Sequence, residues 1–363
     1  MKNNDYSDYD SLNRMAEKLG YSKERSLLRE KAMNIADTLN DERKQFDARI
    51  TYVNDVCMEG SFPEKYLAVF PWLLAYAGKS KSGFDKMQVL WYYKWVITLM
   101  PEFPTVSKRQ IEAALDDLRV KYREYGSTDK VFHDYSREIN ILMGDLDKST
   151  VHHQQHIAFK RKDKLDDCDA CVVNRVVYYH IATGNIEEAL KKAKIIFNGK
   201  KNCTHVPKDT YANFIVPFLI RKEYDKAEEF SENLEAELKK VKHGANYKAA
   251  CPLMLNHLVH KRTANAVKLF DKYFANAFDA KAMDGKFRFY VAGAALFTNI
   301  ERETIKLKLS KNFPHYNTQN TYNVKFLTDW LDTESGKIAA LFDKRNGNDK
   351  YKSDKASFLS LLS

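Results

Sequence analysis

The sequence predicts an all-α protein, an α-solenoid of about seven helical hairpins. Three observations support this fold class. Gly and Pro together make up only 21 of 363 residues, whereas a sheet protein of this length needs many turns marked by these residues. Apolar residues recur at helical spacing along most of the chain, with no alternating strand pattern. The breaks between helices also recur at a nearly constant step of about 40 residues.

The first predicted helices follow residues 1–20, which we expect to form an N-terminal tail. Ser22 is suited to cap a helix whose apolar face comes from residues 27–39. A second helix is predicted over residues 46–57, and Gly60 is suited to end it. This pairing of helices continues along the chain.

Seven predicted turns set the repeat, and successive turns lie 38 to 43 residues apart. Stacked helical hairpins have repeats of roughly 34 to 47 residues. We therefore expect the solenoid to cover residues 21–345. Residues 346–363 begin with the turn dipeptide Asn346–Gly347 and are expected to form a C-terminal tail or cap. The turns are predicted at Gly60, Pro101, Gly144, Gly184, Lys222, Lys261 and Asn299.

The clearest repeat is VYYHIATGNIEEALKKAKII, residues 177–196, in which Gly184 makes the turn and Ala189 allows close helix approach. It resembles the tetratricopeptide repeat, although the step here exceeds that family's usual length of about 34 residues. Other segments, including DCDACVVN (167–174) and CTHVPKDTYA (203–212), are similar to a bacterial family of tetratricopeptide-like proteins of uncharacterised function. This resemblance implies a fold and no established activity.

Composition limits the class of protein. No apolar run approaches the roughly 20 residues that span a bilayer. The polar, acidic segment Met1–Tyr9 has no signal-peptide core. Five cysteines in a chain of this length do not form a disulfide framework. We therefore expect a soluble cytoplasmic protein with reduced thiols and no membrane contact.

The standard catalytic motifs are absent: the sequence contains no GxSxG, P-loop, HExxH or Rossmann glycine pattern. His152, His153 and His156 form an HHxxH pattern that lacks the glutamate of a zinc protease. We interpret it as a polar exposed or groove-facing patch. The sequence thus predicts no enzyme, and His152, His156 and His180 would be the first residues to inspect if it were one.

Four residues have the chemistry of a metal site. Cys168 and Cys171 form a C-x-x-C half-site before one hairpin, and Cys203 and His205 precede the next. Thiolates and imidazole are ligands that tetrahedral Zn²⁺ prefers. Equivalent ends of stacked hairpins meet, so we expect the three cysteines to cluster, with His205 completing a structural zinc site. Reduced structural thiols and a redox pair stay open as alternatives.

The predicted function is that of a non-enzymatic scaffold whose concave face binds a protein or peptide, as a regulator, an adaptor or an immunity protein. The formal charge of +10 raises nucleic acid binding by a basic groove as the alternative. Lysines and arginines are spread along the chain among glutamates, which is typical of a solvated surface. The oligomeric state has no signature in the sequence.

Overall fold

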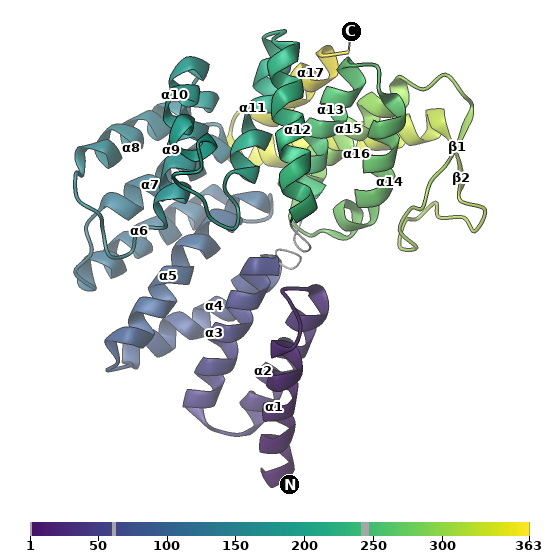
Figure 1. Cartoon of the computed structure of the whole chain (residues 1–363). Helices are drawn as coiled ribbons and strands as arrows, with labels where there is room; N and C mark the ends of the chain where they lie inside the picture. The colour runs from purple at the N-terminus through teal and green to yellow at the C-terminus, as the bar shows by residue number, and fades with distance from the viewer. Residues whose placement is uncertain (1, 60–62, 241–246, 363) are drawn as a thin grey trace.

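The computed structural model describes residues 2–59, 63–240 and 247–362, and they are predominantly helical (Figure 1). These residues confirm the predicted all-α class. The turn expected at Gly60 lies outside them. They form α1 (Lys2–Glu17), α2 (Lys23–Thr38), α3 (Glu42–Glu59), α4 (Pro63–Lys79), α5 (Gly83–Leu99), the 3-10 helix η1 (Met100–Glu102), α6 (Lys108–Glu124), α7 (Lys130–Met143), α8 (Leu146–Ala158), α9 (Asp169–Ala182), α10 (Ile186–Phe197), α11 (Lys208–Ile220), α12 (Tyr224–Lys240), α13 (Tyr247–Val259), α14 (Thr263–Asp279), α15 (Met283–Thr298), β1 (Thr304–Lys306), β2 (Thr321–Asn323), α16 (Val324–Asn346) and α17 (Lys350–Ser360).

Four helix pairs, α7–α8, α9–α10, α11–α12 and α13–α14, are joined by the same tight turn. In the α7–α8 turn, the N–H of Asp145 donates to the carbonyl of Asn140, so that the bond spans six residues. Equivalent hydrogen bonds close the other three turns. This is the Schellman arrangement, which requires one residue in the left-handed region. That residue lies at a predicted turn position each time: Gly144 (φ 78°), Gly184 (φ 77°), Lys222 (φ 60°) and Lys261 (φ 58°).

The first helices of successive pairs contact one another. Helix α9 packs against α7 and α11, and α13 packs against α11 and α15. Buried apolar side chains fill the space between them, as for Phe214 and Phe218 of α11. Residues of helices α3 to α7 form a second large core, which includes Phe70 and Tyr93. Apolar packing thus holds neighbouring helices together within each of these two cores.

Both ends of the chain are helical. Residues 1–20 were expected to form a tail, but α1 packs against α2 and buries Tyr9. In Figure 1, α1 and α2 extend away from the broad body formed by the later helices. At the other end, α17 packs on α15 and α16 and buries Tyr351 and Phe358.

The turn predicted at Asn299 differs from the other turns. Asn299 does end α15, and α15 packs against α16. However, residues 300–323 lie between these two helices and contain strands β1 and β2, which pair antiparallel with Ile305 opposite Tyr322. The apolar side chains Leu307, Leu309 and Phe313 are buried, so this segment packs onto the helices and does not form a short turn.

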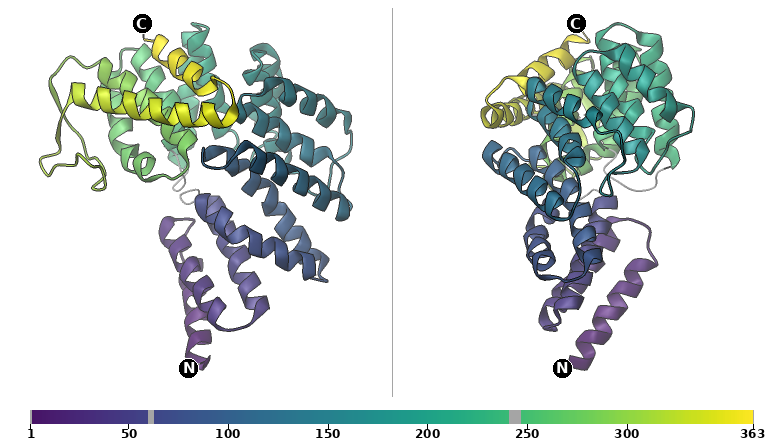
Figure 2. Two further views of the ribbon diagram at one scale, coloured as in Figure 1. Left: turned by 180° about the vertical axis from the view of Figure 1, so that it is seen from behind. Right: turned by 90° about the vertical axis from the view of Figure 1, so that its left-hand side faces the viewer.

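Helix α16 runs back toward the middle of the chain (Figure 2). The guanidinium of Arg345 at its end donates to the backbone carbonyls of Pro101, Phe103 and Val106. Lys248 of α13 also pairs with Glu102 at 2.8 Å. These contacts link residues more than 140 positions apart. Within the described residues, no helix has the length and apolar character needed to cross a membrane.

Candidate metal centre

Cys168 and Cys171 lie at the start of α9. Cys168 is the N-cap residue, and its carbonyl accepts the N–H of Val172 at 3.1 Å. Cys171 follows in the first helical turn. The N-terminus of a helix carries a partial positive charge, which stabilises a thiolate relative to a thiol. Both cysteines therefore lie at the positive end of the α9 dipole.

Cys203 lies in the irregular segment between α10 and α11, where the chain turns tightly. Its N–H donates to the carbonyl of Val206 at 3.0 Å, and its sulfur accepts hydrogen bonds from the backbone N–H groups of His205 and Val206. The hydrogen bond with Cys171, and then these backbone bonds, lower the pKa of Cys203. The same thiol contact, with burial, raises the pKa of Cys171. Cys203 is therefore the first of the pair to ionise.

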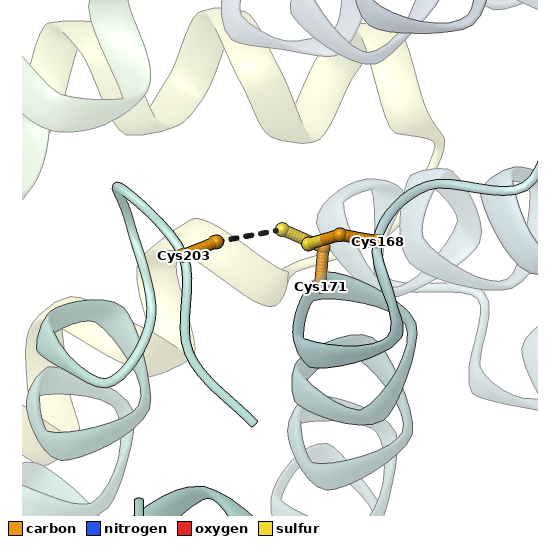
Figure 3. A group of neighbouring side chains, drawn as sticks. All are labelled: Cys168, Cys171 and Cys203. Atoms are coloured by element: carbon orange, nitrogen blue, oxygen red, sulfur yellow. Dashed lines mark hydrogen bonds between the residues drawn. The ribbon is translucent and has the colours of Figure 1, made fainter. Parts of the chain in front are cut away.

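The three sulfurs converge, as Figure 3 shows. All lie within 4.8 Å of one another, and Cys171 Sγ is 3.3 Å from Cys203 Sγ. The predicted clustering is confirmed, because α9 and α11 are neighbours, with Cys168 and Cys171 at the start of α9 and Cys203 in the segment that precedes α11. All three are free thiols.

The donor set fits a metal ion that prefers sulfur. Tetrahedral zinc with Zn–S bonds of about 2.3 Å places its sulfurs roughly 3.8 Å apart. The Cys171 and Cys203 sulfurs, 3.3 Å apart, and the remaining sulfur pairs, within 4.8 Å, bracket that spacing. Cys168, Cys171 and Cys203 could therefore hold a metal ion.

His205, the expected fourth ligand, lies outside this group. The ring nitrogens of His205 are not among the donor atoms within 4.8 Å of one another, and its side chain is exposed. Its backbone, and not its imidazole, contacts Cys203. The structure thus brings three of the four predicted ligands together.

Two residues close in sequence to the cysteines, Asp167 and Asn174, link α9 to neighbouring helices. Asp167, next to Cys168, pairs with Lys94 of α5 at 2.7 Å and with Arg175 of α9 at 2.8 Å. Asn174 of α9 accepts a 2.6 Å hydrogen bond from Thr210 of α11. Lys94 is fully buried, and burial lowers its pKa. These contacts fix α9 against α5 and α11 and so position the start of α9.

The buried ion pairs around α9 were not predicted from the sequence. Arg175 also pairs with Asp134 of α7 at 2.5 Å, and Asp134 pairs with the buried Arg137. Buried charges of this kind are retained only when paired. The available signal was the presence of charged residues inside otherwise apolar helical segments, but one sequence does not show which of them meet.

The histidines of α8 do not form the expected exposed or groove-facing patch. His153 and His156 are buried. His152 Nδ1 lies 2.9 Å from His133 Nδ1, whereas His153 stacks on Tyr179 with ring centroids 3.9 Å apart. His156 Nδ1 lies 3.3 Å from the Lys130 carbonyl. Among the described residues only the cysteines form a group of three or more metal-binding side chains.

Comparison with known proteins adds no relative. The chain has no significant match to a protein-family model, to a curated protein or to a solved structure.

Proposed function

We propose that this chain is a tetratricopeptide-like α-solenoid that acts as a non-enzymatic scaffold for a protein or peptide. The observation that carries the proposal is the repeated hairpin, with one turn geometry recurring at Gly144, Gly184, Lys222 and Lys261. Stacked helical hairpins generate extended surfaces, and such surfaces bind other chains.

The test is capture of a partner followed by reconstitution. Tagged full-length protein is purified from its native cells, and co-purifying proteins are identified by mass spectrometry. A candidate is then produced separately, and its affinity is measured by calorimetry. We expect a stoichiometric complex that forms from the two purified proteins. A complex that cannot be reconstituted would contradict the proposal.

Nucleic acid binding is the alternative that the charge of +10 favours. The two functions differ in salt dependence, because a protein that contacts several phosphates loses affinity steeply as salt rises. Binding of RNA or DNA that weakens about a thousandfold between 50 and 200 mM salt would replace the scaffold proposal. Binding of neither nucleic acid at low salt removes the alternative.

We also propose that the three cysteines form a structural zinc site in this scaffold. The ion would join the start of α9 to the segment that precedes α11, and so one hairpin to the next. Binding energy at a structural zinc site contributes directly to folding stability. We expect about one zinc per chain in protein purified without chelator, and a lower Tm after chelation.

Cys171→Ser tests this zinc site, with Cys57→Ser as the matched control. Cys57 is a free thiol of α3 that packs against the N-terminal core, outside the cysteine group. We expect Cys171→Ser to lose the metal and the effect of chelator on Tm, and Cys57→Ser to keep both. Equal metal content in the two variants would contradict the zinc site.

A further inference from the structure

We propose that the metal bound by Cys168, Cys171 and Cys203 has a fourth coordination position that faces solvent and accepts a neutral nitrogen donor, an imidazole, from outside this chain. The inference rests on the proposed zinc site and deepens it. It adds an exchangeable fourth position to the three protein ligands of that site. It follows from the donor count, the burial around the sulfurs and the local charge.

The donor count leaves one position to fill. Zinc in proteins takes four ligands in tetrahedral geometry when its site is structural, and three protein ligands plus an exchangeable one when the site is open. In the part of the chain that the structure describes, the cysteine group contains three members and no histidine or carboxylate. The protein therefore provides the donor set of an open site.

The imidazole of His205 lies outside the group, and the backbone of this residue is held on both sides. Its N–H donates to the Cys203 sulfur, and its carbonyl accepts the N–H of Asp209 at 2.9 Å. The backbone N–H of His205 is thus bonded to the Cys203 sulfur, and its carbonyl is bonded to the start of α11. Its exposed side chain lies away from the three sulfurs, so His205 does not fill the fourth position in this structure.

Burial around the sulfurs is one-sided. Ala170, Ile196 and Val206 are almost completely buried and form a small apolar cluster against which Cys171 and Cys203 pack. Cys168, in contrast, is exposed, and the other two cysteines are only partly buried. The sulfurs thus have buried apolar side chains on one side and solvent on the other. A ligand can approach from the solvent side, where Cys168 lies.

Local charge selects the kind of ligand. Three thiolates and Zn²⁺ sum to a net charge of −1, and a fourth thiolate or a carboxylate would raise it to −2. The nearby ammonium groups of Lys162 and Lys201 already pair with Asp169, at 3.3 and 2.5 Å. A neutral imidazole adds no charge, and three cysteines with one histidine form an established zinc donor set.

The experiment uses full-length protein loaded with Co²⁺, whose visible bands report coordination. Imidazole is the probe. We expect a thiolate-to-cobalt charge-transfer band on loading, and then a saturable shift of the visible bands as imidazole binds one per cobalt. Visible bands that do not change with imidazole, or loss of the charge-transfer band because imidazole removes the cobalt, would overturn the open position.

The variant His205→Ala separates an external donor from an internal one. We expect its cobalt spectrum and its imidazole titration to match those of the parent protein. A changed spectrum before imidazole is added would show that His205 is a ligand and would overturn the inference, while the zinc site itself would stand. His315→Ala, which removes another exposed histidine, is the matched control.

If the three cysteines do not bind metal, the cobalt spectra differ from both outcomes described above. If neither the parent protein nor His205→Ala develops a thiolate-to-cobalt band, the three cysteines do not bind this class of metal. That outcome overturns the proposed zinc site together with the open position. Loss of the band in Cys171→Ser but not in Cys57→Ser supports the metal site on which the open position depends, because it assigns the band to the cysteine group.

Discussion

His153 illustrates how single buried residues make this fold sensitive to pH. Its ring stacks on Tyr179, and its Nδ1 lies 3.3 Å from the guanidinium of Arg137. Burial, and then the charge of Arg137, lower the pKa of His153 to about 4. Burial, with the neighbouring His152, lowers the pKa of His133 to about 4 as well. Both rings are therefore neutral in the folded protein at pH 7.

The lowered pKa of His153 makes the folded protein less stable at acidic pH. The unfolded chain binds a proton at His153 near pH 6.5, and the folded chain binds it only near pH 4. Stability contributed by this residue is complete above pH 6.5 and is lost as the pH falls toward 4. Between pH 7 and pH 5 this loss is about 2 kcal/mol for one such histidine.

We therefore expect His153→Gln to reduce the pH dependence of stability. The free energy of unfolding, measured by urea titration at pH 7 and pH 5, should differ between the two pH values by about 2 kcal/mol less in the variant than in the parent protein. The control His315→Gln removes an exposed ring. An identical pH dependence in His153→Gln and the parent would contradict the assigned pKa shift.

At the scale of the element, α15 depends on small residues for close packing. A Cβ atom at Gly293 would lie 2.7 Å from the Phe270 ring of α14 and 3.1 Å from Leu331 of α16. Phe270 is fully buried and contacts the rings of Phe289 and Phe297. It has no room to move aside, so Gly293 allows α15 to approach two other helices.

Substitution of Gly293 should therefore destabilise the protein although alanine favours helix formation. We expect Gly293→Ala to lower the free energy of unfolding by about 1–3 kcal/mol, the usual cost of overpacking. Gly78→Ala in α4 is the control, because no atom lies within 4 Å of its added Cβ. It should raise stability by up to about 1 kcal/mol. Thermal and urea unfolding measure both, and equal effects would contradict the packing argument.

At the scale of the whole molecule, contacts between distant residues close the helix array on itself. Arg345, at the end of α16, bonds three carbonyls in residues 101–106. Asn348 donates to the Met143 carbonyl at the end of α7. Burial lowers the pKa of Arg345. These bonds join the C-terminal helices to the η1 region and to the α7–α8 turn.

We expect Arg345→Met to weaken this closure. Methionine keeps the length and helix propensity of the side chain but leaves three carbonyls without their charged donor, which costs about 1.5–3 kcal/mol. Amide hydrogen exchange should quicken in residues 101–106. The neighbouring exposed Lys344 gives the control Lys344→Met, expected to change stability by less than about 0.5 kcal/mol. Unchanged exchange in residues 101–106 would show that other contacts hold the closure.

Some of these features could be predicted from the sequence because their causes are local. Helical periodicity predicts the all-α class, and the turns at Gly144, Gly184, Lys222 and Lys261 each depend on a few consecutive residues. The clustering of Cys168, Cys171 and Cys203 was predictable for a related reason: their spacing is close to one repeat, so stacking brings them together.

Only the tertiary structure decided the rest. It determined that α1 packs as a helix, that residues 300–323 separate α15 from α16, and that His205 lies outside the cysteine group. It also determined the buried environment of His153 and the contact of Arg345 with residues about 240 positions earlier. The physical reason is the same in each case. Burial and long-range hydrogen bonding depend on how the helices pack in space, and no short stretch of sequence specifies that packing.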